Sequence, residues 1–522
     1  MEQINSTKEW QELNNYRNKI NLKELFNSDP NRAKDFAIRT QHLYYDFSRQ
    51  LIDRKVFELL LKLADKAKLK EKISSMFAGE KINKTENRAV LHTALRSFSS
   101  TEVNEVLSKI EQFSCKVISG GHLGATGKKL KNIISIGIGG SYLGPEYLAQ
   151  ALRPYAIKGM NLRFIANVDG SDFAEKTIDL NPEETLFIVV SKTFTTAETM
   201  KNAETAKKWI LKALNNHPES ILKHFAAVST AKEKATAFGI APENIFGFWD
   251  WVGGRFSATS AVGAVPLSLY LGFECFKIIL HGASFMDEHF KNTSFEKNIP
   301  VICGLIDIWN INFLGFKTRA LLPYFQGLSK LPAHTQQVEM ESNGKMVDIE
   351  GRPVGFDTGE VVFGEPGTNG QHSFYQLIHQ GTQTIPCDFI GFIKSQYNLN
   401  EDGITHHEEL MANFFAQPDA LAFGHKNFPG NRPSSSLLLE ELNPFTAGLL
   451  LSWTEHRAAV KGFIWGINSF DQFGVELGKV LGLKIREEII KNHKNKDYKV
   501  SKESYPASHV ALNSFFEKKL PS

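Results

Sequence analysis

The sequence predicts an α/β protein with two parallel-sheet domains, and three observations lead to this fold class. The chain has 522 residues, so at about 150 residues per domain it has room for two to four domains. After about residue 115, short apolar and β-branched runs alternate with helical segments, which is typical of parallel sheets with helices between the strands. Hydrophobic residues make up 42% and charged residues 22% of the chain, the composition of a globular protein.

Residues 1–115 are expected to form a helical region that packs on the second domain. In segments 56–69 and 101–113, apolar residues recur every three or four positions between charged ones. This is the pattern of helices with one buried face. No strand-like alternation and no internal repeat stand out in this region.

The rest of the chain is divided into a first α/β domain (116–285), a second α/β domain (286–500) and a C-terminal tail (501–522). In the first domain, apolar runs predict strands at 132–138, 162–168, 186–190 and 224–228. In the second, the same patterns predict strands at 319–324, 361–363 and 387–392, and helices at 328–341, 372–380, 437–466 and 473–483. The charge-rich stretch 486–502 is expected to be solvated.

Charge and cysteine content argue against several functional classes. Lys and Arg number 60 against 57 Asp and Glu, a formal charge of +3, so the protein is not built to coat nucleic acid or an anionic membrane. The four cysteines include no C-x-x-C pair, which speaks against a disulfide framework or a zinc ribbon. The longest apolar stretch, near 261–273, is too short to cross a bilayer, and the polar N-terminus is not a signal peptide. We therefore expect a cytoplasmic protein.

Two loops that follow predicted strands could bind an anion. Gly137-Ile-Gly-Gly-Ser141 leads into a helix, although Tyr142 stands where a dinucleotide fingerprint needs glycine; a phosphate or sugar loop and a plain tight turn both explain it. Ser191-Lys-Thr-Phe-Thr-Thr196 combines four hydroxyls with one ammonium, and a helix cap is the alternative. Ligands of open α/β sheets bind at the carboxyl ends of the strands, so the two loops together favour a phosphate site.

Three further segments contain side chains that could carry chemistry. Arg255 lies in the glycine-rich DWVGGRFS and could pair with a buried carboxylate or stabilise a developing oxyanion. Glu339 and Glu341 are two residues apart and point to different faces of a helix, so at most one of them can be the general base of a given site. His372 opens a helix and could shuttle a proton or simply bond to the backbone.

Near the C-terminus, Gln472, Glu476 and Lys479 are spaced to share one helix face, which could also be an ordinary exposed face. Metal chemistry finds no support in the motifs: H-E-x-x-H starting at His407 would need histidine where Met411 stands. No G-x-S-x-G nucleophile elbow and no kinase signature set is present.

Six segments together resemble the glucose-6-phosphate isomerase family. DWVGGRFS (250–257) and SFDQFGVELGK (469–479) are similar to the two signature stretches of that family. The other four segments are GIGGS (137–141), SKTFTT (191–196), MESNGK (340–345) and GEPGTNGQH (364–372). The match runs in the family's order from about residue 90 to 480, whereas the N-terminal part and the tail match only loosely.

The resemblance implies two sugar-isomerase (SIS) domains in a homodimer that interconverts glucose 6-phosphate and fructose 6-phosphate without a metal or organic cofactor. It implies that Glu341 moves a proton between C2 and C1 and that Arg255 stabilises the enediolate. It also implies that Lys479 and the partner subunit's His372 open the sugar ring. The substrate-binding residues that the resemblance implies are Gly140, Ser141, Ser191, Lys192, Thr193, Thr196, Gln337 and Gln472.

Two alternatives stay open. One is a related hexose-phosphate isomerase of broader specificity, acting on mannose 6-phosphate or an amino sugar as well. Against an amidotransferase-type relative stands Glu2, where such an enzyme has its catalytic cysteine. The other is a sugar-phosphate-binding module without catalysis, against which the joint presence of Glu341, His372, Lys479 and Arg255 speaks.

Overall fold

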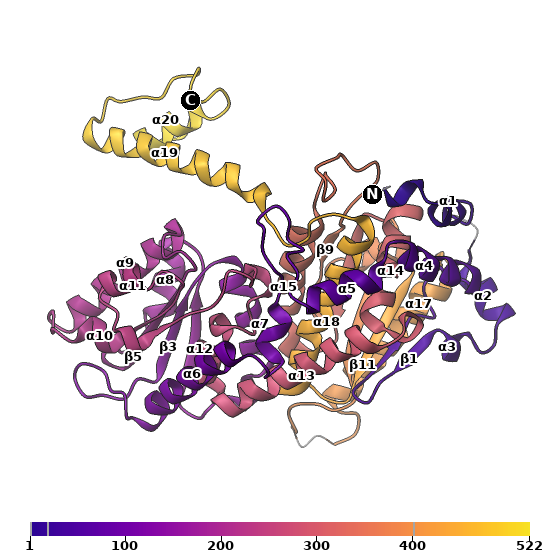
Figure 1. Ribbon diagram of the computed structural model, residues 1–522, viewed down its shortest axis with the longest axis horizontal. Helices are drawn as coiled ribbons and strands as arrows, with labels where there is room; N and C mark the ends of the chain where they lie inside the picture. The colour runs from indigo at the N-terminus through magenta and orange to yellow at the C-terminus, as the bar shows by residue number, and fades with distance from the viewer. Residues whose placement is uncertain (1–2, 18–19, 400–401, 522) are drawn as a thin grey trace. The chain divides into compact units, whose positions relative to one another are not determined.

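A computed structural model describes residues 3–17, 20–399 and 402–521 (Figure 1). The chain divides into two compact units, Met1–Phe470 and Asp471–Ser522. The larger unit contains two sheets with helices on their faces, one in the order β4-β3-β5-β6-β7 and one in the order β1-β2-β11-β10-β8-β9. The predicted α/β class is confirmed, while the four-part domain division stays a prediction.

The first sheet is parallel throughout. Its strands, in spatial order, are β4 (Asn161–Ile165), β3 (Asn132–Ile136), β5 (Thr185–Val190), β6 (Phe225–Val228) and β7 (Ile245–Phe246). The first four lie where strands are predicted, with ends that differ by up to three residues. The two-residue β7 is too short to leave a pattern in the sequence.

Each face of the first sheet is covered by helices because successive side chains of a strand point to opposite faces. Ile133 and Ile188 belong to the large central core, whereas Ile134 and Val189 belong to a separate core on the other face. The helices whose side chains join the central core are α6 (Thr101–Ser119), α7 (Leu143–Ala151) and α12 (Ala261–Leu271). Those on the other face are α8 (Gly170–Thr177), α9 (Ala197–Ala213) and α11 (Lys232–Phe238), and α10 (Ser220–His224) leads into β6.

The second sheet is mixed, which the sequence does not predict. Its strands are β1 (Ala37–Arg39), β2 (Leu43–Asp46), β11 (Ser434–Leu439), β10 (Cys387–Phe392), β8 (Thr318–Pro323) and β9 (Val361–Phe363). The last four are parallel, while β2 runs antiparallel to both β1 and β11. The expectation of helix alone in residues 1–115 is therefore wrong at β1 and β2.

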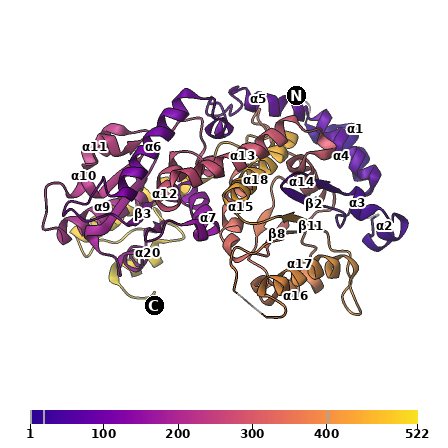
Figure 2. The ribbon, with the colours of Figure 1, turned by 90° about the horizontal axis from the view of Figure 1, so that it is seen from below.

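Helices again cover both faces of the second sheet. Figure 2 shows α16 (Tyr375–Gln380) and α17 (His406–Phe423) below the strands, with α13 (Phe273–Asn292), α14 (Ile299–Ile308) and α18 (Pro444–Trp465) above them. Helix α18 is buried along almost its whole length and packs on α13 and α14. It begins with a capping box between Asn443 and Thr446, so the helix predicted from residue 437 is wrong for its first residues, which form β11.

Before α6, the N-terminal region supplies to the larger unit the helices α1 (Lys8–Asn14), α2 (Leu22–Ser28), α3 (Arg32–Asp35), α4 (Arg54–Lys66) and α5 (Leu69–Phe77). Helix α4 packs on α1 and α14, and α5 packs on α18. The side chain of Asp53 caps α4 by accepting a hydrogen bond from the Val56 amide at 2.7 Å. All four cysteines of the chain are free thiols.

The smaller unit contains α19 (Glu476–Lys494) and α20 (His509–Glu517). The predicted helix at 473–483 is confirmed, but it continues through part of the stretch expected to be a solvated tail. The side chain of Asn513 both accepts from the Val500 amide at 2.8 Å and donates to its carbonyl at 3.0 Å, which ties α20 to the preceding loop. Among the helices of the described residues, none has the length and apolar character that crossing a bilayer requires.

Candidate active site

The two glycine- and hydroxyl-rich loops follow neighbouring strands at the same edge of the first sheet. Strands β3 and β5 are parallel partners, with Ile136 opposite Val189. A methyl group placed on Gly137 would lie 3.3 Å from the Val190 side chain, so the start of one loop touches the end of the neighbouring strand. After β3, Gly139–Ser141 forms a single 3₁₀ turn and leads into α7. The sheet therefore brings the two predicted anion loops together.

The loop at 191–196 presents its hydroxyls at the beginning of α9. Ser191 is buried, and its Oγ lies 3.3 Å from Oγ1 of Thr196. Thr196 is the N-cap residue of α9, but its side chain makes no capping hydrogen bond to the helix. Thr193 is exposed and its Oγ1 lies 2.7 Å from that of Thr195. The alternative interpretation of this loop, a helix cap, therefore does not apply to the side chain of Thr196.

Lys192 connects this loop to the DWVGGRFS segment. Its Nζ donates to the carbonyl oxygens of Asp250 at 3.2 Å and Val252 at 3.4 Å. Burial, with a smaller effect from the positive charge of Arg88, lowers the pKa of the Lys192 ammonium. An anion at the loop would relieve this penalty, because an opposite charge favours the protonated form.

Gly140 and Gly254 bring the first-sheet loop and the DWVGGRFS segment into backbone contact. A methyl group on Gly140 would lie 2.1 Å from the carbonyl carbon and oxygen of Gly254 and 2.7 Å from the amide nitrogen of Arg255. The hydroxyl of Ser257 also donates to the Gly140 carbonyl at 3.4 Å. Position 140 therefore requires glycine, since a side chain would push away the turn that carries Arg255.

Arg255 is a buried cation with partners on three sides. Its Nε donates to Oγ of Ser342 at 2.7 Å, and one terminal nitrogen donates to the carbonyl of Ser469 at 2.6 Å. The other terminal nitrogen lies 3.5 Å from Oε2 of Glu341. The sequence left two interpretations of Arg255, the partner of a carboxylate and the stabiliser of an oxyanion. Both are compatible with this geometry, because the carboxylate beside the guanidinium is itself the candidate base.

Glu341 is the last residue of a π-turn within a helical segment that continues to Asn343. Helix α15 (Leu331–Gln336) continues directly into the π-turn Gln337–Glu341. The side-chain amide of Gln337 donates to Oε2 of Glu341 at 3.0 Å, and the Glu341 side chain is 22% exposed. Glu339 is 1% exposed and lies among buried cations instead. The two carboxylates do point to different sides, as their spacing predicts.

Three predicted residues remain: His372, Gln472 and Lys479. His372 lies exposed at the end of the 3₁₀ turn Asn369–His372. Gln472 and Lys479 belong to the smaller unit, where Nζ of Lys479 pairs with Glu476 at 2.9 Å. Roles for these three residues at the site stay a prediction.

Sequence reasoning missed two residues that hold the site together, Ser342 and Ser469. Ser342 directly follows the candidate base, and Ser469 begins the second signature stretch, so each stands inside a segment already singled out. What the sequence does not show is that both contact one arginine.

One group of carboxylates in the described part of the chain has the spacing of a metal site. Oxygens of Asp307, Glu339 and Glu360 lie within 4.8 Å of one another. However, the ammonium of Lys461 lies 3.1, 2.8 and 2.7 Å from these three carboxylates, so a side-chain cation already occupies their centre. The group is therefore an internal ion cluster and not a candidate metal centre.

Comparisons with known proteins agree with one another. The family described as phosphoglucose isomerase matches residues 46–505. The chain is 54% identical over 506 residues, 90% of its length and 88% of the relative's, to a protein named cytosolic glucose-6-phosphate isomerase from Zea mays. It is 52% identical over 524 residues, 93% of each chain, to one of the same name from Arabidopsis thaliana. The crystal structure of a glucose-6-phosphate isomerase from Chlamydia trachomatis is 31% identical, covers 99% of this chain and 100% of its own, and aligns with a TM-score of 0.87.

Proposed function

The chain belongs to the phosphoglucose isomerase family, and on that premise we propose that it interconverts D-glucose 6-phosphate and D-fructose 6-phosphate. The observation that carries the proposal is the placement of a part-exposed carboxylate, Glu341, 3.5 Å from the buried guanidinium of Arg255. Moving a carbonyl between neighbouring carbons needs one base and a fixed positive charge for the intermediate. This pair has the chemistry for both.

In the proposed reaction, Glu341 accepts the proton from C2 of the open-chain aldose. The electron pair of that C–H bond forms the C1–C2 double bond, and the carbonyl electrons move onto O1 to give an enediolate. A proton passes from O2 to O1, and Glu341 then returns its proton to C1 while the C2 carbonyl forms. No electrons enter or leave the substrate. The hydrogen bond from Gln337 orients the carboxylate, and Arg255 provides positive charge beside the enediolate.

The loop at 191–196 is proposed to hold the 6-phosphate, with Ser191, Lys192, Thr193 and Thr196 as donors. The first turn of α9 adds backbone N–H groups, because a helix N-terminus attracts anions. Gly140 and Ser141 would lie along the sugar, since their loop neighbours this one at the sheet edge. The phosphate is remote from C1 and C2, so its binding energy serves to position the sugar.

Ring opening is proposed to use Lys479 and the partner subunit's His372, with Gln472 lining the site, in a cytosolic homodimer. One feature supports a dimer: His372 is exposed, as a residue contributed to another chain's site would be.

The test is a coupled assay. Metal-stripped protein and fructose 6-phosphate are mixed with the NADP-dependent dehydrogenase of glucose 6-phosphate, and NADPH is followed. We expect steady turnover in the wild type, and in Glu341→Gln a loss of roughly 10²–10⁴-fold with near-normal binding of 6-phosphogluconate. Near-wild-type turnover of Glu341→Gln would remove that residue from the base role. Turnover of mannose or amino-sugar phosphates at a similar rate would favour the broader isomerase, and ligand binding without any turnover would favour a binding module.

A further inference from the structure

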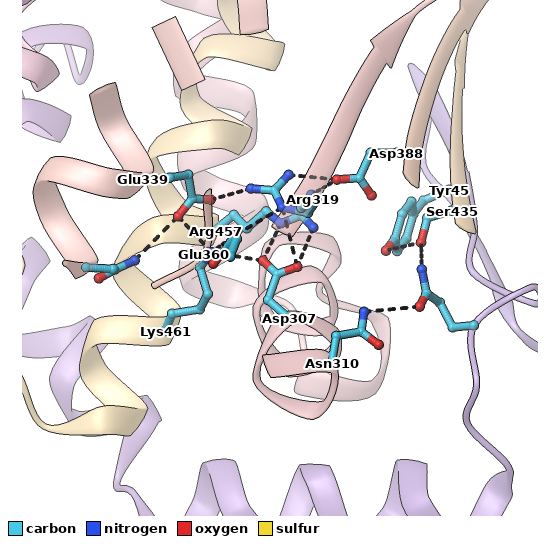
Figure 3. Close-up of polar contacts among 12 residues, drawn as sticks. Tyr45, Asp307, Asn310, Arg319, Glu339, Glu360, Asp388, Ser435, Arg457 and Lys461 are labelled. Carbon is cyan, nitrogen blue, oxygen red and sulfur yellow. Dashed lines mark hydrogen bonds and ion pairs between the residues drawn. The ribbon is translucent and has the colours of Figure 1, made fainter. Parts of the chain in front are cut away.

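A buried cluster of charged side chains adjoins the π-turn that carries Glu341 (Figure 3). This ion cluster consists of Asp307, Arg319, Glu339, Glu360, Asp388, Arg457 and Lys461, and none of them is more than 7% exposed. Its members come from α14, β8, β10, α18, the π-turn and the segment before β9. Replacing buried ion pairs by apolar side chains of similar size is often neutral for stability, so stability alone does not account for the cluster.

Glu339 is the member of the ion cluster that belongs to the π-turn. Its Oε1 pairs with Arg319 of β8 at 3.1 Å, and its Oε2 pairs with Lys461 of α18 at 2.8 Å. The two bonds therefore attach the turn to a strand on one side and to a helix on the other. Since Glu341 follows only two residues later, the direction of the base depends on where this attachment holds the turn.

A second path leads from Glu339 to the candidate cation of the site. Asn343 donates to Oε2 of Glu339 at 3.4 Å and to the Ala458 carbonyl at 3.0 Å. Its amide oxygen accepts from the Ser469 hydroxyl at 2.8 Å, and the Ser469 carbonyl accepts from Arg255. The base and the cation are thus fixed to the same polar framework.

We propose that Glu339 is a positioning residue for the isomerisation: it fixes the π-turn so that Glu341 can reach both C2 and C1. This inference rests on the proposed function, because Glu339 acts only through Glu341. Glu339 itself neither binds the substrate nor transfers a proton. Loss of this positioning should change the fate of the proton that Glu341 takes from C2. A displaced Glu341 loses its proton to water more often before returning it to C1.

Glu360 provides a matched control within the same cluster. Its Oε1 pairs with the same two cations as Glu339, Lys461 at 2.7 Å and Arg319 at 3.0 Å, and it too is buried. It lies on the segment before β9 and not on the π-turn. Four carboxylates face three cations in the cluster, so Glu339→Gln and Glu360→Gln each leave three of each sign. The two variants therefore remove the same charge, but Glu339→Gln loosens the π-turn that carries Glu341, whereas Glu360→Gln loosens the segment before β9.

The experiment follows [2-³H]glucose 6-phosphate and compares label transferred to C1 with label lost to water, alongside kcat and KM. We expect Glu339→Gln to lower kcat about 10- to 100-fold with KM within about threefold, and to lower the transferred fraction, since a 1 Å misplacement can have effects of this size. Glu360→Gln should keep the wild-type transferred fraction. Equal behaviour of the two variants, or an unchanged transferred fraction in Glu339→Gln, would overturn the inference.

Two further measurements cover a variant that does not fold and a failure of the proposed function. If Glu339→Gln does not fold, Glu339→Asp and Glu360→Asp, which keep the charge and shorten the reach, are compared by the same readout and with the same expected difference. Turnover of the wild type and its loss in Glu341→Gln establish the proposed function separately. A wild type without turnover would refute both, whereas normal wild-type turnover with an unaffected Glu339 variant would refute only the positioning role.

Discussion

Replacing Gly140 by alanine should displace the guanidinium of Arg255 through a clash with the backbone of Gly254 and Arg255. The new methyl carbon would lie 2.1 Å from the backbone of Gly254, whereas ordinary contact begins at 3.4 Å, so the two segments must separate by about 1.3 Å. The obstacle is backbone on both sides and cannot be relieved by rotating a side chain. Gly254 is exposed and has room to give way towards solvent, so we expect the 3₁₀ turn Gly254–Phe256, which carries Arg255, to move.

The size of the effect follows from that displacement. A shift of about 1 Å in a catalytic group can lower the rate about 100-fold. A 100-fold loss of kcat/KM corresponds to about 2.7 kcal/mol of transition-state stabilisation. We expect most of the loss in kcat, because the cation acts mainly on the enediolate and less on the bound sugar.

The measurement is kcat and KM for fructose 6-phosphate in the coupled assay, with thermal unfolding recorded in parallel. Gly247→Ala is the control, because a methyl group there meets nothing within 4 Å and the backbone is not in the left-handed region. We expect wild-type kinetics from the control. A Gly140→Ala enzyme that folds and retains more than about half of wild-type kcat would refute the claim that this contact sets the position of Arg255.

Three other predictions concern the phosphate, acid stability and the dimer. Lys192→Met should raise KM for fructose 6-phosphate about tenfold or more with a smaller change in kcat, because it removes a charge of the phosphate loop; an unchanged KM would contradict that role. Burial lowers the pKa of His334 from 6.5 to about 4, so its contribution to stability is present above pH 6.5 and is lost as the pH falls through about 4. As the pH falls between these values, His334→Gln should therefore lose less unfolding free energy than the wild type, by up to roughly 3 kcal/mol, and its Tm should fall less. Equal losses of stability in the two proteins would contradict this role of His334. Mixing His372→Ala with Glu341→Gln chains should restore about a quarter of wild-type activity, because heterodimers carry one intact site; no recovery after verified subunit exchange would rule out sharing of His372.

The sequence predicts the first sheet well because its strands are short, apolar and enclosed on both faces. β3 and β5 are buried at every residue, which leaves a continuous apolar run. The strands it misses lack that signal. β11 reads SSSLLL and looks like the start of the following helix, while β1 and β2 have three and four residues, too few to show alternation.

The site is predictable where its chemistry is local, and it is not where its support comes from distant parts of the chain. The anion loops and the glutamate pair are each contained in a few residues. The ion cluster is assembled from positions 307 to 461, and its members look ordinary in sequence: Arg457 and Lys461 are four residues apart, like a pair on an exposed helix face. Only the fold shows that this face of α18 is buried.

The proposed catalytic pair shares the polar framework of Asn343 and Ser469, but each partner also has a support of its own next to a different sheet, and we expect these two supports to have separable effects. Gly140, in the turn that follows β3 of the first sheet, lies against the turn of Arg255, whereas Glu339 attaches the turn of Glu341 to the second sheet through Arg319. Gly140→Ala should therefore weaken stabilisation of the enediolate and leave the transferred fraction of the C2 label near the wild-type value. Glu339→Gln should change that fraction. If both variants lowered it equally, base and cation would move as one rigid body, and the separate attachments would have no separate function.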